Sequence, residues 1–170
     1  MADKIKVAMI DDEMDLCLLV KGNLEETGEF TVVASADPQN AEQFIKQELP
    51  DVVLLDNVMP DRMGSEIAKL LKKDETTRRI PIIMVSGKGE MVYNKKKQDF
   101  QWIPNNPLAQ KRGKLPEVKG SEALAGAYGV DDYISKPFAT EVLVDVIKEV
   151  LKAKKKVPKE QEDGPGAPSP

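Results

Sequence analysis

One stretch decides the predicted fold: Pro50-Asp51-Val52-Val53-Leu54-Leu55-Asp56-Asn57-Val58-Met59-Pro60. Its four consecutive aliphatic residues do not alternate with polar ones, which is typical of a strand covered by helices on both faces of a parallel sheet. In open sheets of that kind, ligands bind beyond the carboxyl ends of the strands. Asp56, which ends the apolar run, is therefore predicted to lie at that edge, although a single aspartate after a strand is more often a turn residue or a helix cap.

Shorter apolar runs on both sides of this stretch alternate with amphipathic segments of helical period. Besides the strand at residues 52–55, strands are predicted at 4–10, 30–34, 81–85 and 132–135, and helices at 13–27, 37–49, 65–73, 121–128 and 140–151. Such alternation predicts βαβ units with right-handed crossovers. The expected fold class is α/β, a doubly wound, five-stranded parallel sheet with helices on both faces.

Composition excludes several classes of function. The 170 residues suffice for one domain, and the net charge of −4 gives no reason to expect nucleic-acid binding. With no histidine and one cysteine, there can be no Ser-His-Asp triad, histidine metal site or cysteine zinc cluster. No apolar stretch is long enough to cross a bilayer and the polar start is no secretory signal, so a cytoplasmic location without membrane insertion is expected.

The segment from about 88 to 120 interrupts the alternation and is interpreted as an insertion. It contains eight basic and three acidic residues, a net charge of +5, and little periodicity. A solvated, unstructured loop is the favoured interpretation. The alternative is a docking element, built around Tyr93, Phe100 and Trp102, for an acidic partner or a second copy of the chain, and single-stranded nucleic acid ranks below both. Residues 157–170 are predicted to form a disordered tail.

Polar residues follow four of the predicted strands. Asp11 and Asp12 follow the first, Asp56 the third, Ser86 the fourth and Lys136 the fifth. If these strands lie side by side, three carboxylates, a hydroxyl and an ammonium meet, which is the outline of a phosphoryl-transfer site that would need Mg²⁺ or Mn²⁺ to offset the carboxylate charge. Taken singly, each residue has an ordinary explanation as a helix cap, a turn residue or a surface charge.

As a set, these motifs resemble the receiver domain of two-component response regulators, the family with the chemotaxis-regulator fold. The motifs are Ile10-Asp11-Asp12-Glu13, the stretch around Asp56, Ser86-Gly87-Lys88-Gly89 and Tyr133-Ile134-Ser135-Lys136-Pro137-Phe138. The resemblance covers residues 4–156 apart from the insertion. It implies a single domain over residues 1–156 and a flavodoxin-like sheet with strand order 2-1-3-4-5.

The resemblance also implies a role for each site residue. Asp56 would accept a phosphoryl group from a phosphohistidine of a histidine kinase or histidine phosphotransfer protein, forming an aspartyl phosphate. Asp11, Asp12 and the backbone carbonyl of Val58 would hold Mg²⁺ together with Asp56. Lys136 would contact the phosphoryl group, and Ser86 and Tyr133 would act as the switch that reports phosphorylation. The chain would then be a signalling module of a phosphorelay rather than an enzyme, catalysing only its own phosphorylation and dephosphorylation.

Other functions stay open at this point. No output domain is expected after residue 151, so the chain would act by docking to a downstream protein or by passing the phosphoryl group on, unless it is a piece of something longer. A homodimer is a further alternative. A scaffold that binds partners through the insertion, whatever the state of Asp56, is the main alternative. A Mg²⁺-dependent phosphatase would want an acid at the position of Val58, and a dinucleotide-binding domain would want a Gly-x-Gly-x-x-Gly motif after the first strand. The apolar Val58 also predicts a phosphoryl lifetime of minutes or more.

Overall fold

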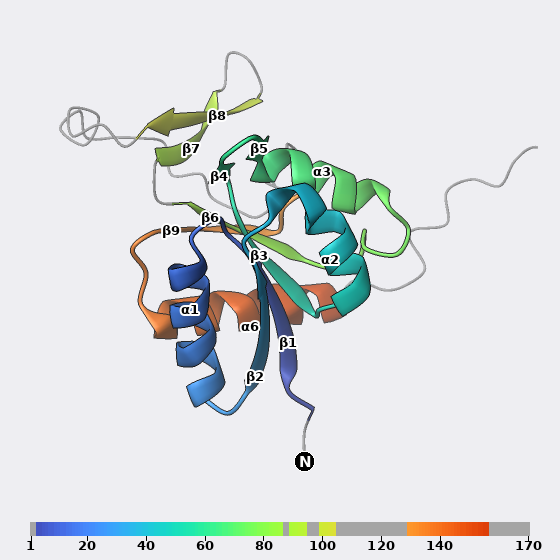
Figure 1. Ribbon diagram of the computed structural model, residues 1–170, viewed down its shortest axis with the longest axis vertical. Helices are drawn as coiled ribbons and strands as arrows, with labels where there is room; N and C mark the ends of the chain where they lie inside the picture. The colour runs from blue at the N-terminus through green and yellow to red at the C-terminus, as the bar shows by residue number, and fades with distance from the viewer. Residues whose placement is uncertain (1–2, 87–88, 95–98, 105–128, 157–170) are drawn as a thin grey trace, which may run out of the picture.

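A five-stranded, all-parallel sheet forms the centre of the molecule (Figure 1). Its strands, in spatial order, are β2 (Phe30–Ser35), β1 (Ile5–Ile10), β3 (Val52–Asp56), β6 (Ile82–Ser86) and β9 (Asp132–Ser135). If only the five strands of this sheet are numbered along the chain, their spatial order is 2-1-3-4-5. The predicted flavodoxin-like topology is therefore confirmed. The computed structural model describes residues 3–86, 89–94, 99–104 and 129–156.

Two apolar cores separate the sheet from its helices. On one face, α1 (Met14–Glu26) and α6 (Thr140–Lys156) bury residues such as Leu24 and Ile147 against the strands. On the other, α2 (Ala41–Glu48) and α3 (Gly64–Lys73) do the same with Ile45 and Ile67. The predicted coverage of both faces is therefore confirmed.

The burial of β3 explains the unbroken apolar run at residues 52–55. All five of its residues are buried, and successive residues face opposite cores, with Leu54 in the core below α1 and α6 and Leu55 in the core below α2 and α3. Because both faces are apolar, the sequence shows no alternation. Asp56 is the last residue of this strand, as predicted.

Several boundaries differ from the prediction. The segment opened by Asp37 begins as a 3₁₀ turn, η1 (Pro38–Asn40), before α2, and the Asp37 carboxylate accepts a hydrogen bond from the amide of Gln39 at 3.0 Å. Two short strands that we did not predict, β4 (Val58–Met59) and β5 (Arg62–Met63), pair antiparallel between β3 and α3. The predicted helix at 121–128 and the tail at 157–170 lie outside the described residues.

The favoured interpretation of the insertion as an unstructured loop is wrong for part of it. β7 (Gly89–Asn94) and β8 (Asp99–Pro104) form an antiparallel ribbon, at the upper left of Figure 1. Residues 87–88, 95–98 and 105–120 lie outside the description. The sequence contained a signal for β8, since Phe100-Gln101-Trp102 alternates as a strand does.

Among the described helices, none is both long and apolar enough to cross a lipid bilayer.

Candidate functional site

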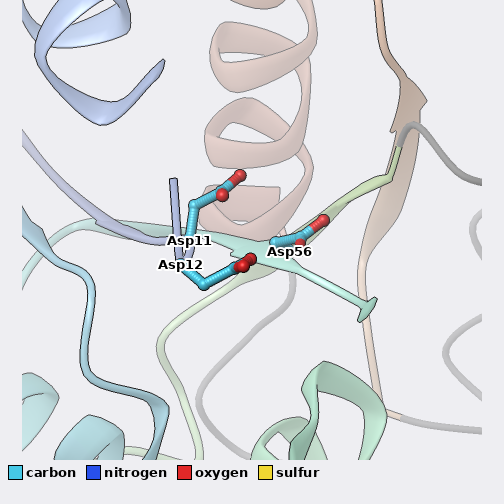
Figure 2. A group of neighbouring side chains, drawn as sticks. All are labelled: Asp11, Asp12 and Asp56. Atoms are coloured by element: carbon cyan, nitrogen blue, oxygen red, sulfur yellow. The ribbon is translucent and has the colours of Figure 1, made fainter. Parts of the chain in front are cut away.

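Three carboxylates meet at the carboxyl edge of the sheet. Asp11 and Asp12 follow β1 and Asp56 ends β3, its neighbour in the sheet. One oxygen atom from each side chain lies within 4.8 Å of the others. Figure 2 shows the three side chains grouped together. Asp11 and Asp56 are buried and Asp12 is partly exposed. The acidic cluster predicted from the strand ends is thus present.

Lys136, which follows β9, reaches this cluster from the far strand. Its Nζ atom lies 2.6 Å from Oδ2 of Asp11 and 3.4 Å from Oδ1 of Asp56. Burial alone would lower the pKa of Lys136, but the hydrogen bond to Asp11 and the charge of Asp56 outweigh it and raise this pKa. Lys136 therefore stays protonated and, among the residues that the structure describes, supplies the positive charge of the cluster.

The pKa of Asp56 is raised to about 6, above the ordinary value of 3.8 for an aspartate. Burial is the largest cause, the ammonium of Lys136 opposes it, and the carboxylates of Asp11 and Asp12 add to it. At neutral pH the carboxylate is mostly ionised and its charge is only partly compensated. Such a displaced pKa in a cluster of charges is typical of functional sites.

The chemistry of these side chains fits a hard divalent cation. Three carboxylates carry three negative charges against one from Lys136, and two of those carboxylates are buried. Asp11 also accepts a hydrogen bond from the amide of Glu13 at 2.9 Å, whereas Asp12 has no hydrogen-bond partner among the described residues. Oxygen ligands and excess negative charge suit Mg²⁺ or Mn²⁺, so the cluster is compatible with a metal of that class.

The loop after Asp56 depends on two residues that sequence reasoning did not place in the site. A Cβ atom on Gly64 would lie 2.1 Å from the backbone carbonyl oxygen of Asp56, so only glycine fits there. Arg62 in β5 pairs with Glu42 in α2, far along the chain. A glycine and a lone arginine carry no motif, which is why the sequence alone did not indicate them.

The remaining predicted site residues lie on neighbouring elements. Val58 begins β4, two residues after Asp56, and pairs with Met63. Ser86 is the last residue of β6, where its backbone pairs with Ser135, and Tyr133 lies in β9, partly buried against the core below α2 and α3. The structure therefore places all of them near the carboxyl edge or on the strands that form it, while their predicted roles stay predictions.

An apolar groove adjoins the cluster on the side of α1. It has a volume of about 410 Å³ and lies between α1, the segment after β9 and the start of α6. Leu19 and Phe138 contribute to its walls, together with Lys136. Leu18 and Leu19 expose 55% and 59% of their surface and so add apolar surface to α1.

Comparison with known proteins points in one direction. The model of the response regulator receiver domain matches residues 7–100. The phosphate regulon transcriptional regulatory protein PhoB of Rhizobium meliloti is 31% identical over 151 residues, which is 88% of this chain and 53% of that protein, and PhoB of Escherichia coli K12 is 30% identical over 147 residues. The chain thus spans about half the length of the curated relatives it matches.

Solved structures support the same fold. A CheY-like response regulator receiver domain protein from Methanospirillum hungatei has a TM-score of 0.64 at 22% identity, covering 91% of this chain and 98% of that one. A putative response regulator from Chloroflexus aurantiacus has a TM-score of 0.62 at 23% identity, covering 88% of this chain and 99% of that one. At such identities these structures speak for the fold alone.

Proposed function

The chain belongs to the family of response regulator receiver domains, and we propose that Asp56 accepts a phosphoryl group from a phosphohistidine of a partner protein in a reaction that requires Mg²⁺ or Mn²⁺. One observation carries the proposal: the Asp56 carboxylate lies beside two further carboxylates and 3.4 Å from the Lys136 ammonium, at the carboxyl edge of the sheet. An isolated turn aspartate would not need this surplus of charge. Phosphorylation would then switch the docking of a downstream protein.

The proposed transfer uses Asp56 as a nucleophile. One of its carboxylate oxygens attacks phosphorus, the bond between phosphorus and the imidazole nitrogen breaks, and its electron pair stays on that nitrogen, which takes up a proton. An acyl phosphate forms on Asp56. Because the pKa of Asp56 is about 6, the carboxylate is ionised, and hence nucleophilic, at neutral pH.

The other site residues would offset the charge that the phosphoryl group brings. Lys136, already 3.4 Å from Asp56, would donate a hydrogen bond to a phosphoryl oxygen. Asp11, Asp12, Asp56 and the carbonyl of Val58 would hold the metal ion, which would neutralise the carboxylates and the phosphoryl oxygens. Ser86 and Tyr133 would report the new charge to a neighbouring face of the domain.

The phosphoryl donor is another molecule, because this sequence contains no histidine. We propose a histidine kinase or a histidine phosphotransfer protein, docked on the exposed apolar residues of α1 and the groove beside Lys136. The groove is lined in part by Lys136, which lies 3.4 Å from Asp56, and a protein docked there would exclude water from the transfer. Leu18→Glu should slow phosphorylation by the protein donor and leave phosphorylation by acetyl phosphate unchanged.

The direct test uses acetyl phosphate and Mg²⁺. Intact-mass measurement should show one added phosphoryl group on the wild-type chain and none on Asp56→Asn. Asp61→Asn is the matched control, since Asp61 is exposed in the adjoining loop and its φ of 63° is tolerated by asparagine. Because some receivers accept phosphate only from their own kinase, Mg²⁺-dependent binding of beryllium fluoride is measured in parallel. Loss of both signals in the wild type would overturn the proposal.

The ribbon of β7 and β8 favours a second candidate, a scaffold that binds partners whatever the state of Asp56. Its backbone register pairs Met91 with Trp102 and Tyr93 with Phe100. An acidic protein partner would suit the lysine-rich segment around it. Deletion of residues 94–117 should abolish partner binding without affecting phosphorylation of Asp56, and unchanged binding would contradict this candidate.

Several sequence predictions stay proposals. They are the domain extent of residues 1–156, a cytoplasmic location, a homodimer, the phosphoryl lifetime of minutes or more, and the absence of nucleic-acid binding. The names of the curated relatives count against the last of these proposals, because they are transcriptional regulatory proteins. They match this chain over about half their own length.

A further inference from the structure

The loop that contains Val58, whose carbonyl would bind the metal ion, does not have a stable conformation by itself. It consists of β4 and β5, two strands of two residues each, which pair Val58 with Met63 and Met59 with Arg62. A ribbon this short is not stable by itself in water. Other contacts must therefore set where Val58 lies relative to Asp56.

Two hydrogen bonds join the two ends of the loop. The amide of Gly64 donates to the carbonyl of Asn57 at 2.9 Å, and the amide of Ser65 donates to the Asn57 side chain at 3.2 Å. These bonds fix the residues that flank the ribbon. They do not reach its middle, where β5 begins.

Arg62 holds the middle of the loop. Its Nη1 atom donates to Oε2 of Glu42 at 2.8 Å and to the carbonyl of Pro38 at 2.9 Å, and its Nη2 atom donates to the other carboxylate oxygen of Glu42. The side chains of Arg62 and Glu42 expose only 15% and 24% of their surface. We call this arrangement the Arg62 clamp.

The geometry of the clamp makes it directional. A planar guanidinium that binds both oxygens of one carboxylate and a backbone carbonyl fixes orientation as well as distance, which a lysine ammonium cannot do. Glu42 and Pro38 belong to α2 and η1, and α2 packs against the sheet through Ile45. The clamp therefore ties the loop to a rigid part of the core.

We infer that Arg62 and Glu42 are positioning residues for the phosphoryl site: by fixing the loop that carries Val58, the clamp sets the affinity of the site for its divalent cation. The inference rests on the proposed function, because it takes the Val58 carbonyl as a ligand. Neither residue touches the reacting atoms. Outer contacts that orient metal ligands typically change metal affinity by about 10–100-fold when removed.

The test measures Mg²⁺ binding by calorimetry in the full chain. Arg62→Gln and Glu42→Gln should each raise the dissociation constant for Mg²⁺ by about tenfold, and the double variant should be no weaker than either single one, since one interaction is lost in all three. Arg62→Lys should fall between the wild type and Arg62→Gln. The initial rate of labelling by acetyl phosphate should fall in the same order at limiting Mg²⁺ and recover at saturating Mg²⁺.

A matched control comes from the same helix. Lys46 in α2 forms an ion pair with Asp74 at 2.6 Å and does not contact the loop, so Lys46→Gln should leave the dissociation constant for Mg²⁺ unchanged. Urea unfolding identifies any variant that does not fold. If Arg62→Gln does not fold, the Mg²⁺ affinities of Arg62→Lys and Glu42→Gln, compared with that of the wild type, decide.

Two results would overturn the inference, and they differ. Variants that lose stability but keep the wild-type Mg²⁺ affinity would make the clamp a structural tie only, with the proposed function intact. A wild-type chain that binds neither Mg²⁺ nor beryllium fluoride would overturn the proposed function and the inference with it.

Discussion

Two clusters of lysine and aspartate lie at opposite edges of the central sheet. At the carboxyl edge, Asp11, Asp12 and Asp56 share Lys136. At the amino edge, Asp131 precedes β9, accepts a hydrogen bond from the amide of Ile82 at 2.8 Å, and pairs with the Nζ atoms of Lys72 and Lys154, both at 3.3 Å.

The clusters differ in how far their own residues compensate their charges. Lys72 and Asp131 form a partly buried pair with one charge of each sign, and Lys72 also donates to the carbonyl of Ile80 at 2.7 Å. The second lysine, Lys154, has a side chain that is 40% exposed, so water solvates its charge. Burial lowers the pKa of Lys72, and Asp131 counteracts this. The carboxyl edge instead keeps a surplus of negative charge around Asp56. Compensation is what a structural contact requires, whereas a surplus is stable only if a ligand supplies the missing charge.

The largest expected effect is at the amino edge. Asp131→Asn leaves the Lys72 ammonium without its carboxylate and should lower the free energy of unfolding by about 3 kcal/mol, the low end for a broken buried pair because both side chains are partly exposed. Urea unfolding measures the loss. Asp145→Asn on the exposed side of α6 is the control and should change stability by less than about 0.5 kcal/mol. A loss that small for Asp131→Asn would mean that the amino-edge cluster is not structural.

Each cluster packs against a glycine, and the two glycines should respond differently. Gly64→Ala places a Cβ atom on the Asp56 carbonyl, a backbone clash that should cost about 2–3 kcal/mol and weaken Mg²⁺ binding. Gly129→Ala, at a φ of 70° and 2.7 Å from Cγ of Lys72, should cost about 1–2 kcal/mol and leave Mg²⁺ binding unchanged. Calorimetry and urea unfolding on both variants make the comparison. Equal effects on Mg²⁺ affinity would remove the distinction between the two edges.

Neutralising the carboxyl edge should have the opposite sign. Without divalent cations at neutral pH, Asp56→Asn should raise the free energy of unfolding by about 1–2 kcal/mol, because it removes an incompletely compensated buried charge. Excess Mg²⁺ should stabilise the wild type more than the variant and so reduce this gain. A loss of stability without Mg²⁺ would show that Asp56 is as well compensated as Asp131.

The pH dependence of stability follows from the raised pKa of Asp56. Below pH 3.8 the carboxyl group is protonated in both the folded and the unfolded chain, so its stabilising contribution is complete. Between 3.8 and about 6 the unfolded chain loses this proton while the folded chain keeps it, and the contribution declines until it is lost above about 6. We therefore expect the unfolding free energy of the wild type, less that of Asp56→Asn, to fall as the pH rises through this window. Both are measured without Mg²⁺. A flat difference would contradict the raised pKa.

The sequence allowed the carboxyl edge to be predicted because each of its residues ends a strand or follows one within two residues. An apolar run followed by an acid marks Asp56 and Asp11 locally, and the parallel topology then brings the strand ends together. The alternation of apolar runs and amphipathic segments predicted the helices on both faces, whereas the strand order was predicted from the resemblance to receiver domains. Sequence reasoning failed for the ribbon of β7 and β8, where lysines and prolines in the same segment obscured the alternation of Phe100 to Trp102.

The amino edge and the Arg62 clamp could not be predicted in this way. Lys72 and Asp131 are 59 residues apart, and Arg62 and Glu42 are 20 apart, with no local pattern that marks either pair. Which residues pair depends on how α2 and α3 pack on the sheet. That packing is tertiary structure, which a local sequence pattern does not indicate. A charged residue on an amphipathic helix is otherwise expected to be solvated.

The most direct test of the account is the binding of Mg²⁺ at the carboxyl edge. Calorimetric titration at neutral pH should show a single Mg²⁺ ion bound by the wild type and by Asp131→Asn, with at least about tenfold weaker binding by Asp12→Asn, which removes one carboxylate charge but no hydrogen bond among the described residues. Unaltered binding in Asp12→Asn, or no binding in the wild type, would contradict the claim that the surplus charge around Asp56 exists to hold a cation.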